Sequence, residues 1–136
     1  MKEYVLDANA LLRLFRNLEG AAKIQDLLIQ ADKKQAWLRI SVVNLTEVLY
    51  VFARYATLED ARRAIQKVKR LVEFASPESE HALAAGELHH RYKLGLADCF
   101  AAELAMRLRA TLVTADPDFE RLGKQLKVLA LPRHTA

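Results

Sequence analysis

Short apolar runs alternate along the chain with longer stretches in which apolar residues recur at helical spacing. Runs of four to six residues that are rich in β-branched and other apolar side chains are typical of buried strands. The sequence predicts strands at 4–6, 36–40, 72–75, 111–114 and 128–131. Each of these runs is separated from the next by helical periodicity or by turn residues.

The intervening stretches predict helices over 11–16, 24–31, 57–71 and 97–108. A further helix is expected to end near Tyr55, with Ser41 or Asn44 as its cap, and another to begin at Ser76-Pro77 and reach Tyr92 or Lys93. Gly123 is expected to close a short helix. Strands that alternate with helices in this way predict one α/β domain over residues 1–136. We expect a short parallel sheet of about four to five strands with helices on both faces.

Composition supports a single globular domain with one core. Hydrophobic residues make up 52% of the 136 residues and charged residues 28%, which excludes a disordered chain. Cys99 is the only cysteine, so we expect a small buried residue and a reducing compartment. No signal peptide and no run of 18 uncharged apolar residues stands in the sequence. The protein is therefore expected to be cytoplasmic, with no membrane association.

The formal charge of +4 is compatible with a polyanionic partner without identifying one. Basic residues gather on the expected helix over 57–71, where a solvated helix face is narrowly preferred over contact with a polyanion. As candidate contacts with such a nucleic-acid partner we name Arg62, Arg63, Lys67 and Arg70.

Four acidic residues share one structural setting. Each is expected at the end of a strand or the start of a helix, namely Asp7, Glu47, Asp98 and Asp116. In a parallel sheet these positions gather at the carboxyl edge, where α/β proteins bind ligands. For each acid alone, a role as helix cap or as partner of a helix dipole is at least as good an explanation as a functional site. Four together favour a shared site.

Carboxylates brought together in this way repel one another, and a divalent cation would relieve the repulsion. Mg²⁺ and Mn²⁺ prefer oxygen ligands, and such ions can activate water for phosphodiester hydrolysis. No cysteine and histidine cluster suggests zinc. The histidines have no spacing that links them to the acids, and we expect surface or partner contacts for His81, His89, His90 and His134.

Four segments resemble the successive acidic motifs of PIN-domain ribonucleases. They are Val5-Leu6-Asp7-Ala8-Asn9, Asn44-Leu45-Thr46-Glu47-Val48, the segment 96–102 and the segment 113–119. In size the chain is most similar to the VapC-like toxins of type II toxin-antitoxin systems. The resemblance implies a PIN-like nuclease domain, a Mg²⁺- or Mn²⁺-dependent endoribonuclease with Asp7, Glu47, Asp98 and Asp116 as its catalytic and metal-binding acids.

The same resemblance implies further features. Asn9 and Thr114 would support the acids, and the products would carry 5′-phosphate and 3′-hydroxyl ends. A homodimer and a small inhibitory antitoxin are implied as partners besides RNA. Ala8 stands where the family often has a hydroxyl residue, and Asp118 adds a second acid to the last motif, either as an indirect metal contact or for the helix start.

Two alternatives stay open at this point. A response-regulator-like receiver is also a small parallel α/β domain with acids at strand ends, but it needs a phosphate-accepting Asp after a middle strand. The middle strands here lead to Ser41 and Ser76. A PIN scaffold without catalytic activity would bind RNA or protein only, and the presence of all four acids weighs against it.

Overall fold

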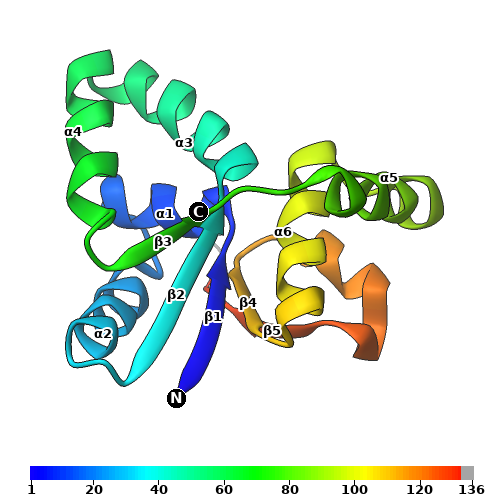
Figure 1. Cartoon of the computed structure of the whole chain (residues 1–136). Coiled ribbons are helices and arrows are strands. Elements are labelled where there is room, and N and C mark those ends of the chain that lie inside the picture. The colour runs from blue at the N-terminus through cyan, green and yellow to red at the C-terminus, as the bar shows by residue number, and fades with distance from the viewer. Residues whose placement is uncertain (133–136) are drawn as a thin grey trace.

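Five strands form one parallel sheet in the order β3-β2-β1-β4-β5 (Figure 1). The computed structural model describes residues 1–132. The strands are β1 (Lys2–Leu6), β2 (Ala36–Ser41), β3 (Val72–Ala75), β4 (Thr111–Thr114) and β5 (Lys127–Ala130). Every neighbouring pair runs parallel, with Leu6 beside Ile40 on one side and Val113 on the other. The predicted α/β architecture is confirmed.

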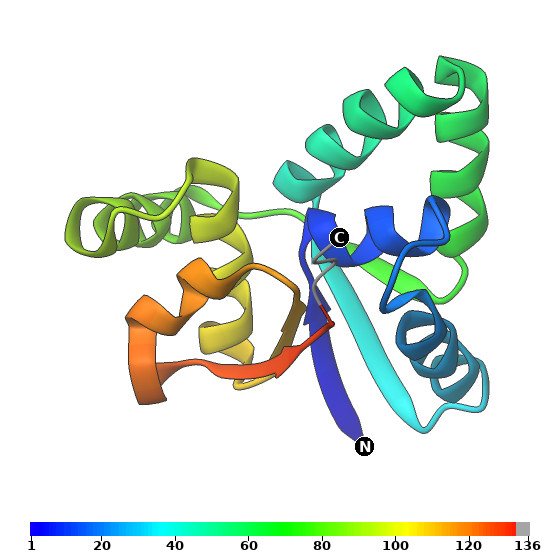
Figure 2. The ribbon, with the colours of Figure 1, turned by 180° about the vertical axis from the view of Figure 1, so that it is seen from behind.

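Helices cover both faces of this sheet, as Figures 1 and 2 show from opposite sides. One group consists of α1 (Ala8–Phe15), α2 (Ala21–Asp32), α3 (Val42–Tyr55) and α4 (Leu58–Val68). The other consists of α5 (Ser79–Tyr92), α6 (Leu96–Leu108) and the 3₁₀ segment η1 (Pro117–Gln125). Within η1, Gly123 has a φ of 59° and breaks the helical path.

Alternation along the central strand divides the core between the two faces. Tyr4 and Leu6 point into the cluster formed with α1, α2 and α3, whereas Val5 packs with α5, α6 and η1. Leu112 of β4 joins the same cluster as Val5, and it is fully buried. Because both faces are covered, the buried part of β1, Tyr4 to Leu6, is apolar on successive residues. Helices packed on both faces hold β1 and β4 in place, and with them Asp7 and Asp116, which follow these strands.

One predicted helix start is corrected by the structure, and one choice between two caps is decided. Helix α5 begins at Ser79 rather than at Ser76-Pro77, because Glu78 rather than Ser76 caps it, in a capping box with His81. At the start of this helix, the Glu78 N–H donates a hydrogen bond to Nδ1 of His81 at 3.0 Å. Helix α3 begins after Ser41, whose hydroxyl accepts the Val43 N–H at 3.2 Å.

Several smaller predictions can be compared directly. Cys99 is buried and free, as expected. The last strand begins one residue earlier than predicted, at Lys127. His134 lies outside the described residues. No helix within residues 1–132 is long and apolar enough to cross a membrane.

Candidate active site

A pocket of about 440 Å³ opens at the carboxyl edge of the sheet, where β1 and β4 end. The four acids come to it from four elements. Asp7 precedes α1, Glu47 lies in the second turn of α3, Asp98 lies in the first turn of α6, and Asp116 precedes η1. All four line the same pocket. The structure therefore brings together the side chains that the sequence singled out.

Asp7 is the most deeply placed of the four, with 2% of its surface exposed. Its Oδ1 accepts the Ala10 N–H at 2.8 Å, which makes it the cap of α1. Its Oδ2 accepts a hydrogen bond from the Thr114 hydroxyl. Asp7 thus caps a helix and lines the pocket at once, because the pocket lies at the start of that helix.

Burial raises the pKa of Asp7 to about 7. The hydrogen bonds from Thr114 and Ala10 lower the pKa, and the charges of Asp98 and Asp116 raise it. The pKa of Asp98 rises to about 6, first through burial and then through the nearby carboxylates, Asp116 before Glu47 and Asp118. Burial is the largest cause of both shifts, and the neighbouring carboxylates add to them by disfavouring one another's charged forms. A cation between the acids would lower that repulsion.

Thr114 connects the ends of the two central strands. It is buried at 1% exposure, and its hydroxyl accepts the Asp116 N–H at 2.9 Å while donating to Asp7. Asp116 in turn accepts the Asp118 N–H at 2.9 Å and caps η1. The carboxylate of Asp118 pairs with Arg121 at 3.4 Å and does not line the pocket. Asp118 stands in the first turn of η1, and an indirect metal contact by Asp118 stays a prediction.

Asn9 also lines the pocket, and it is held there by Arg13, a residue that no sequence motif singled out. Nε of Arg13 donates to Oδ1 of Asn9 at 3.0 Å. Nη1 of Arg13 donates to the carbonyls of Glu19 and Pro132, at 2.8 and 2.9 Å. The only sign of this contact in the sequence is that Asn9 and Arg13 are four residues apart, which places them on the same face of a helix.

Asn44 has a role other than the capping considered from the sequence. It lies inside α3 at 1% exposure, three residues before Glu47 and therefore on the same helix face. Its Nδ2 donates to the Ala97 carbonyl at 3.2 Å, next to Asp98. Its Oδ1 is buried and has no partner among the described residues. The hydrogen bond from Nδ2 ties the helix of Glu47 to the helix of Asp98.

The basic residues named on α4 lie away from the acidic pocket, since none of them lines it. Arg63 pairs with Glu59 at 2.8 Å and lies 3.7 Å from Asp60, both on its own helix. Arg62 lines a separate surface pocket between α3 and α4, and Arg70 lines another that includes Trp37. Whether these residues contact RNA stays a prediction.

The donor set of the acidic pocket suits a hard divalent cation. The pocket offers the oxygen atoms of four carboxylates. Mg²⁺ is commonly held by one or two carboxylates together with several waters. Within residues 1–132, no three acidic, histidine or cysteine side chains lie close enough together to form a ready metal-binding group. Four carboxylates around one pocket would leave room for an ion that also keeps water ligands.

Replacing Thr114 by Val is expected to destabilise the protein by about 1–3 kcal/mol, because the Asp7 carboxylate and the Asp116 N–H both lose a partner. The loss should be larger at pH 8 than at pH 5, because the hydroxyl lowers the pKa of Asp7 by favouring its charged form. Urea denaturation at both pH values measures the difference. The matched control is Thr111→Val at the half-buried start of the same strand. Equal losses for the two variants would contradict the role given to Thr114.

The fold and the pocket together define a class of protein: a parallel α/β domain with a carboxylate-lined pocket at the carboxyl edge of its sheet. The sequence matches the family model for the PIN domain over residues 4–125. The chain belongs to the PIN domain family. Among curated proteins none matches this sequence.

Solved structures with the same fold are numerous, and several of them are toxin-antitoxin proteins. VapBC2 from Rickettsia felis, bound to a promoter DNA fragment, is 20% identical, with a TM-score of 0.76 over 96% of this chain and 99% of that chain. VapC20 from Mycobacterium tuberculosis, a toxin that cleaves the sarcin-ricin loop, is 14% identical, with a TM-score of 0.74 over 95% and 99%. DNA-bound VapBC from Salmonella typhimurium is 17% identical, with a TM-score of 0.73 over 96% and 98%. At these identities the similarity shows a shared fold.

Proposed function

We propose that this protein is a metal-dependent endoribonuclease that hydrolyses RNA phosphodiester bonds, with residues 1–136 acting as one nuclease domain. The observation that carries the proposal is the meeting of Asp7, Glu47, Asp98 and Asp116 in one pocket of a PIN-family chain. Such a set of mutually repelling carboxylates suits a divalent cation and the phosphate that the cation would bind.

In this proposal Asp7, Glu47, Asp98 and Asp116 would hold Mg²⁺ or Mn²⁺, directly or through its waters, and the bound ion would supply charge for the phosphate and activate water. Asp7 is positioned by the Thr114 hydroxyl and the Ala10 N–H, so its carboxylate has little freedom to turn. Asn9 is held by Arg13 beside the acids and offers an amide to the substrate or to water. The hydrolysis is expected to leave 5′-phosphate and 3′-hydroxyl ends.

The direct test is cleavage of RNA by the purified protein in the presence of Mg²⁺ or Mn²⁺ and in the presence of EDTA. Cleavage with either ion, its loss with EDTA, and its return when the ion is restored are expected. A PIN scaffold that only binds RNA would leave the RNA intact under every condition, and that result would reject the enzyme. Ligation and labelling of the product ends checks the expected 5′-phosphate.

We further propose that the protein is the toxin of a type II toxin-antitoxin system, acts in the cytoplasm, forms a homodimer, and is inhibited by a small antitoxin. The support is the fold shared with VapBC proteins over nearly the whole chain. The product of a neighbouring small reading frame should co-purify with this chain and stop its cleavage of RNA. Sedimentation equilibrium of the isolated chain tests the dimer. The receiver-like alternative lacks support, because the chain belongs to the PIN family.

Gly95 offers a test of how closely the pocket is fitted. A Cβ added at Gly95 would lie 3.3 Å from Oδ2 of Asp98, so Gly95→Ala requires the carboxylate to shift. We expect roughly a tenfold loss of cleavage rate, since small displacements of a reacting group are costly. Gly86→Ala is the control, because nothing lies within 4 Å of its added Cβ in α5. It should stabilise the helix by about 1 kcal/mol and leave cleavage unchanged. An unchanged rate for Gly95→Ala would show that Asp98 tolerates the shift.

A further inference from the structure

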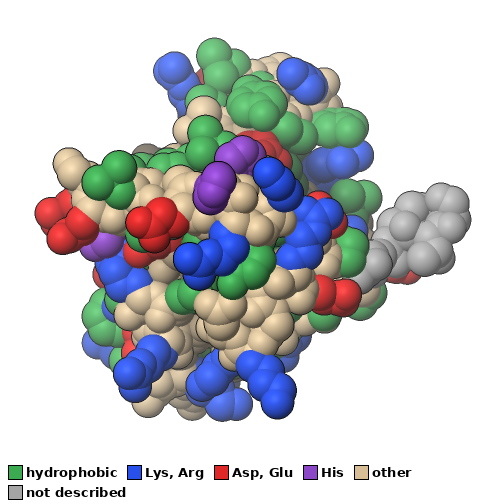
Figure 3. Space-filling view, turned by 90° about the vertical axis from the view of Figure 1, so that its right-hand side faces the viewer, with side chains coloured by type: hydrophobic (Ala, Val, Ile, Leu, Met, Phe, Trp, Pro, Cys, Tyr) green, Lys and Arg blue, Asp and Glu red, His purple; other side chains and the backbone are tan. Residues whose placement is uncertain are grey.

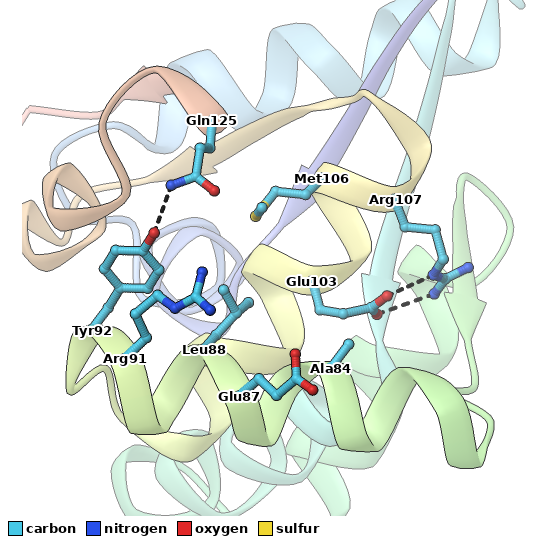
Figure 4. A pocket seen from close by; sticks show the side chains of 9 residues that line it. All are labelled: Ala84, Glu87, Leu88, Arg91, Tyr92, Glu103, Met106, Arg107 and Gln125. Atoms are coloured by element: carbon cyan, nitrogen blue, oxygen red, sulfur yellow. Dashed lines mark hydrogen bonds and ion pairs between the residues drawn. The ribbon is translucent and has the colours of Figure 1, made fainter.

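A second pocket, of about 380 Å³, lies between α5, α6 and η1 (Figure 4). Its apolar part is formed by Ala84 and Leu88 of α5 and Met106 of α6. These side chains give a floor on which a flat ring can pack. The volume is that of a small-molecule site rather than of an extended protein groove.

Polar groups stand around this apolar floor. Nε2 of Gln125 donates to the Tyr92 hydroxyl at 2.6 Å, which joins η1 to the end of α5. Glu103, only 7% exposed, pairs with Arg107 at 2.8 Å. Figure 4 shows the Arg91 side chain reaching from α5 toward the pocket beside Leu88. Arg91 makes no ion pair with any described residue, so its charge is available to a ligand.

The pocket has a basic rim. The rim consists of the cationic side chains that line the pocket, Arg91 and Arg107, and of two exposed lysines next to lining residues in the chain, Lys93 and Lys124. Two carboxylates, Glu87 and the paired Glu103, also line the pocket. Figure 3 shows the face of the molecule on the α5 and α6 side, where Lys and Arg side chains are prominent. Arg107 is paired with Glu103 of its own helix, as Arg63 is with Glu59 on α4, so the rim charges that make no ion pair within residues 1–132 are those of Arg91, Lys93 and Lys124. A cationic rim around an apolar floor suits an anionic ligand that carries flat rings.

The rim reaches the acidic pocket through the turn between α5 and α6. Lys93, at the end of α5, has a φ of 61° and turns the chain toward Gly95, which lies against the Asp98 carboxylate. Nη1 of Arg121 donates to the Lys93 carbonyl at 3.0 Å, so η1 is fastened to the same turn. The turn 93–95 therefore joins Tyr92, which lines the second pocket, to the start of the helix that carries Asp98, which lines the acidic pocket.

We propose that the pocket between α5, α6 and η1 binds one unstacked base of the substrate RNA, and that its basic rim binds the flanking phosphates. This inference rests on the proposed ribonuclease function. Proteins recognise single-stranded RNA by stacking splayed bases on aromatic or guanidinium planes and by hydrogen bonding to the base edges. Tyr92, Arg91 and Gln125 supply a ring, a guanidinium and an amide at this place. The pocket would contribute to the choice of RNA sequence, while the acids cut the backbone.

The test measures binding of a labelled, mixed-sequence single-stranded RNA by fluorescence anisotropy. All proteins carry Asp7→Asn so that the RNA stays intact. The double variant Arg91→Ala/Lys124→Ala is compared with Lys33→Ala/Lys127→Ala, which removes the same charge. Lys33 and Lys127 are exposed, line neither pocket and stand just before or at the start of β2 and β5, at the other edge of the sheet from the acids. We expect the rim variant to bind at least about tenfold more weakly at 0.1 M salt. The slope of log K against log salt should become shallower by about 0.7 for each RNA phosphate that the variant no longer neutralises. The control variant should stay within about threefold of the parent.

Base binding is tested separately by crosslinking of RNA that contains 4-thiouridine, followed by mass spectrometry. Crosslinks in the peptides that contain Tyr92 or Gln125 are expected. Crosslinks confined to α4, or a rim variant that binds as tightly as its parent, would overturn the proposal. The rim variant is also examined by sedimentation equilibrium. Dissociation of a dimer with unchanged RNA affinity would assign the pocket to an interface between two copies instead.

Failure of this inference can be told apart from failure of the proposed function. If the wild-type protein cleaves RNA with Mg²⁺ and the rim variant binds RNA as tightly as its Asp7→Asn parent, only the second pocket is wrongly assigned. If the protein neither cleaves nor binds RNA, the ribonuclease proposal itself fails.

Discussion

Replacing Asp7 by Asn is expected to abolish RNA cleavage and, in the absence of metal, to stabilise the protein at pH 8. Cleavage should fall at least about 100-fold, because a neutral amide cannot replace the charged ligand. Stability should rise by on the order of 2–4 kcal/mol, because a buried carboxylate with a pKa of about 7 is charged at pH 8 against the cost of burial. The Asn carbonyl can still accept the Ala10 N–H, and its amide can donate to Thr114.

Opposite changes in activity and stability make this variant informative. A loss of cleavage that came from unfolding would be accompanied by a lower melting temperature, whereas a higher one is expected. At pH 5 the gain in stability should disappear, because the wild-type Asp7 is then largely protonated. Asp32→Asn serves as control, since Asp32 is exposed at the end of α2 and does not line the acidic pocket. Equal cleavage by the wild type and Asp7→Asn would reject the assignment of Asp7.

Mg²⁺ is expected to stabilise the protein strongly at pH 8 and hardly at all at pH 5. Without metal, the folded state binds more protons than the unfolded state between about pH 4 and pH 7, because the pKa of Asp7 is raised from 3.8 to about 7. The stability contributed by Asp7 is therefore fully present below about pH 4 and is lost as the pH rises through 7. Mg²⁺ needs the charged carboxylates, so its affinity rises over the same range.

Thermal unfolding with Mg²⁺ and with EDTA measures this linkage. At 100 times the dissociation constant, the ion adds about 2.7 kcal/mol and should raise the melting temperature by roughly 10 °C at pH 8. The pKa of Asp98, near 6, places a second titrating group in the same window. In the variant Asp7→Asn most of the Mg²⁺ effect should be absent. A shift of equal size at both pH values would mean that the ion binds elsewhere.

The capping and catalytic interpretations of the acids are compatible in this fold. Asp7 and Asp116 each cap a helical segment and also line the pocket. The coincidence has a physical cause, because both roles use the partial positive charge and free N–H groups at helix starts, and in a parallel α/β sheet these starts lie at one edge. A capping pattern in the sequence is therefore no argument against a site.

Some local features were beyond sequence reasoning. Ser76-Pro77 is a good capping pair, yet α5 begins three residues later with Glu78 and His81 in its first turn. The choice between Ser41 and Asn44 as the cap of α3 depended on where β2 ends. The role of Arg13 in holding Asn9 depends on hydrogen bonds to the carbonyls of Glu19 and Pro132. Glu19 lies in a loop and Pro132 is distant in sequence, so neither contact could be predicted.

The sequence by itself determined the alternation of strands and helices and the identity of the four acids, because apolar periodicity and acids at strand ends are local properties. Their meeting depended on the parallel order β3-β2-β1-β4-β5, which places the ends of β1 and β4 side by side. Only the tertiary structure decided the burial that raises the pKa of Asp7, the hydrogen bond from Asn44 to Ala97, and the basic pocket beyond Gly95. Each of these arises from packing between segments far apart in the chain, and no local pattern records which segments will pack together.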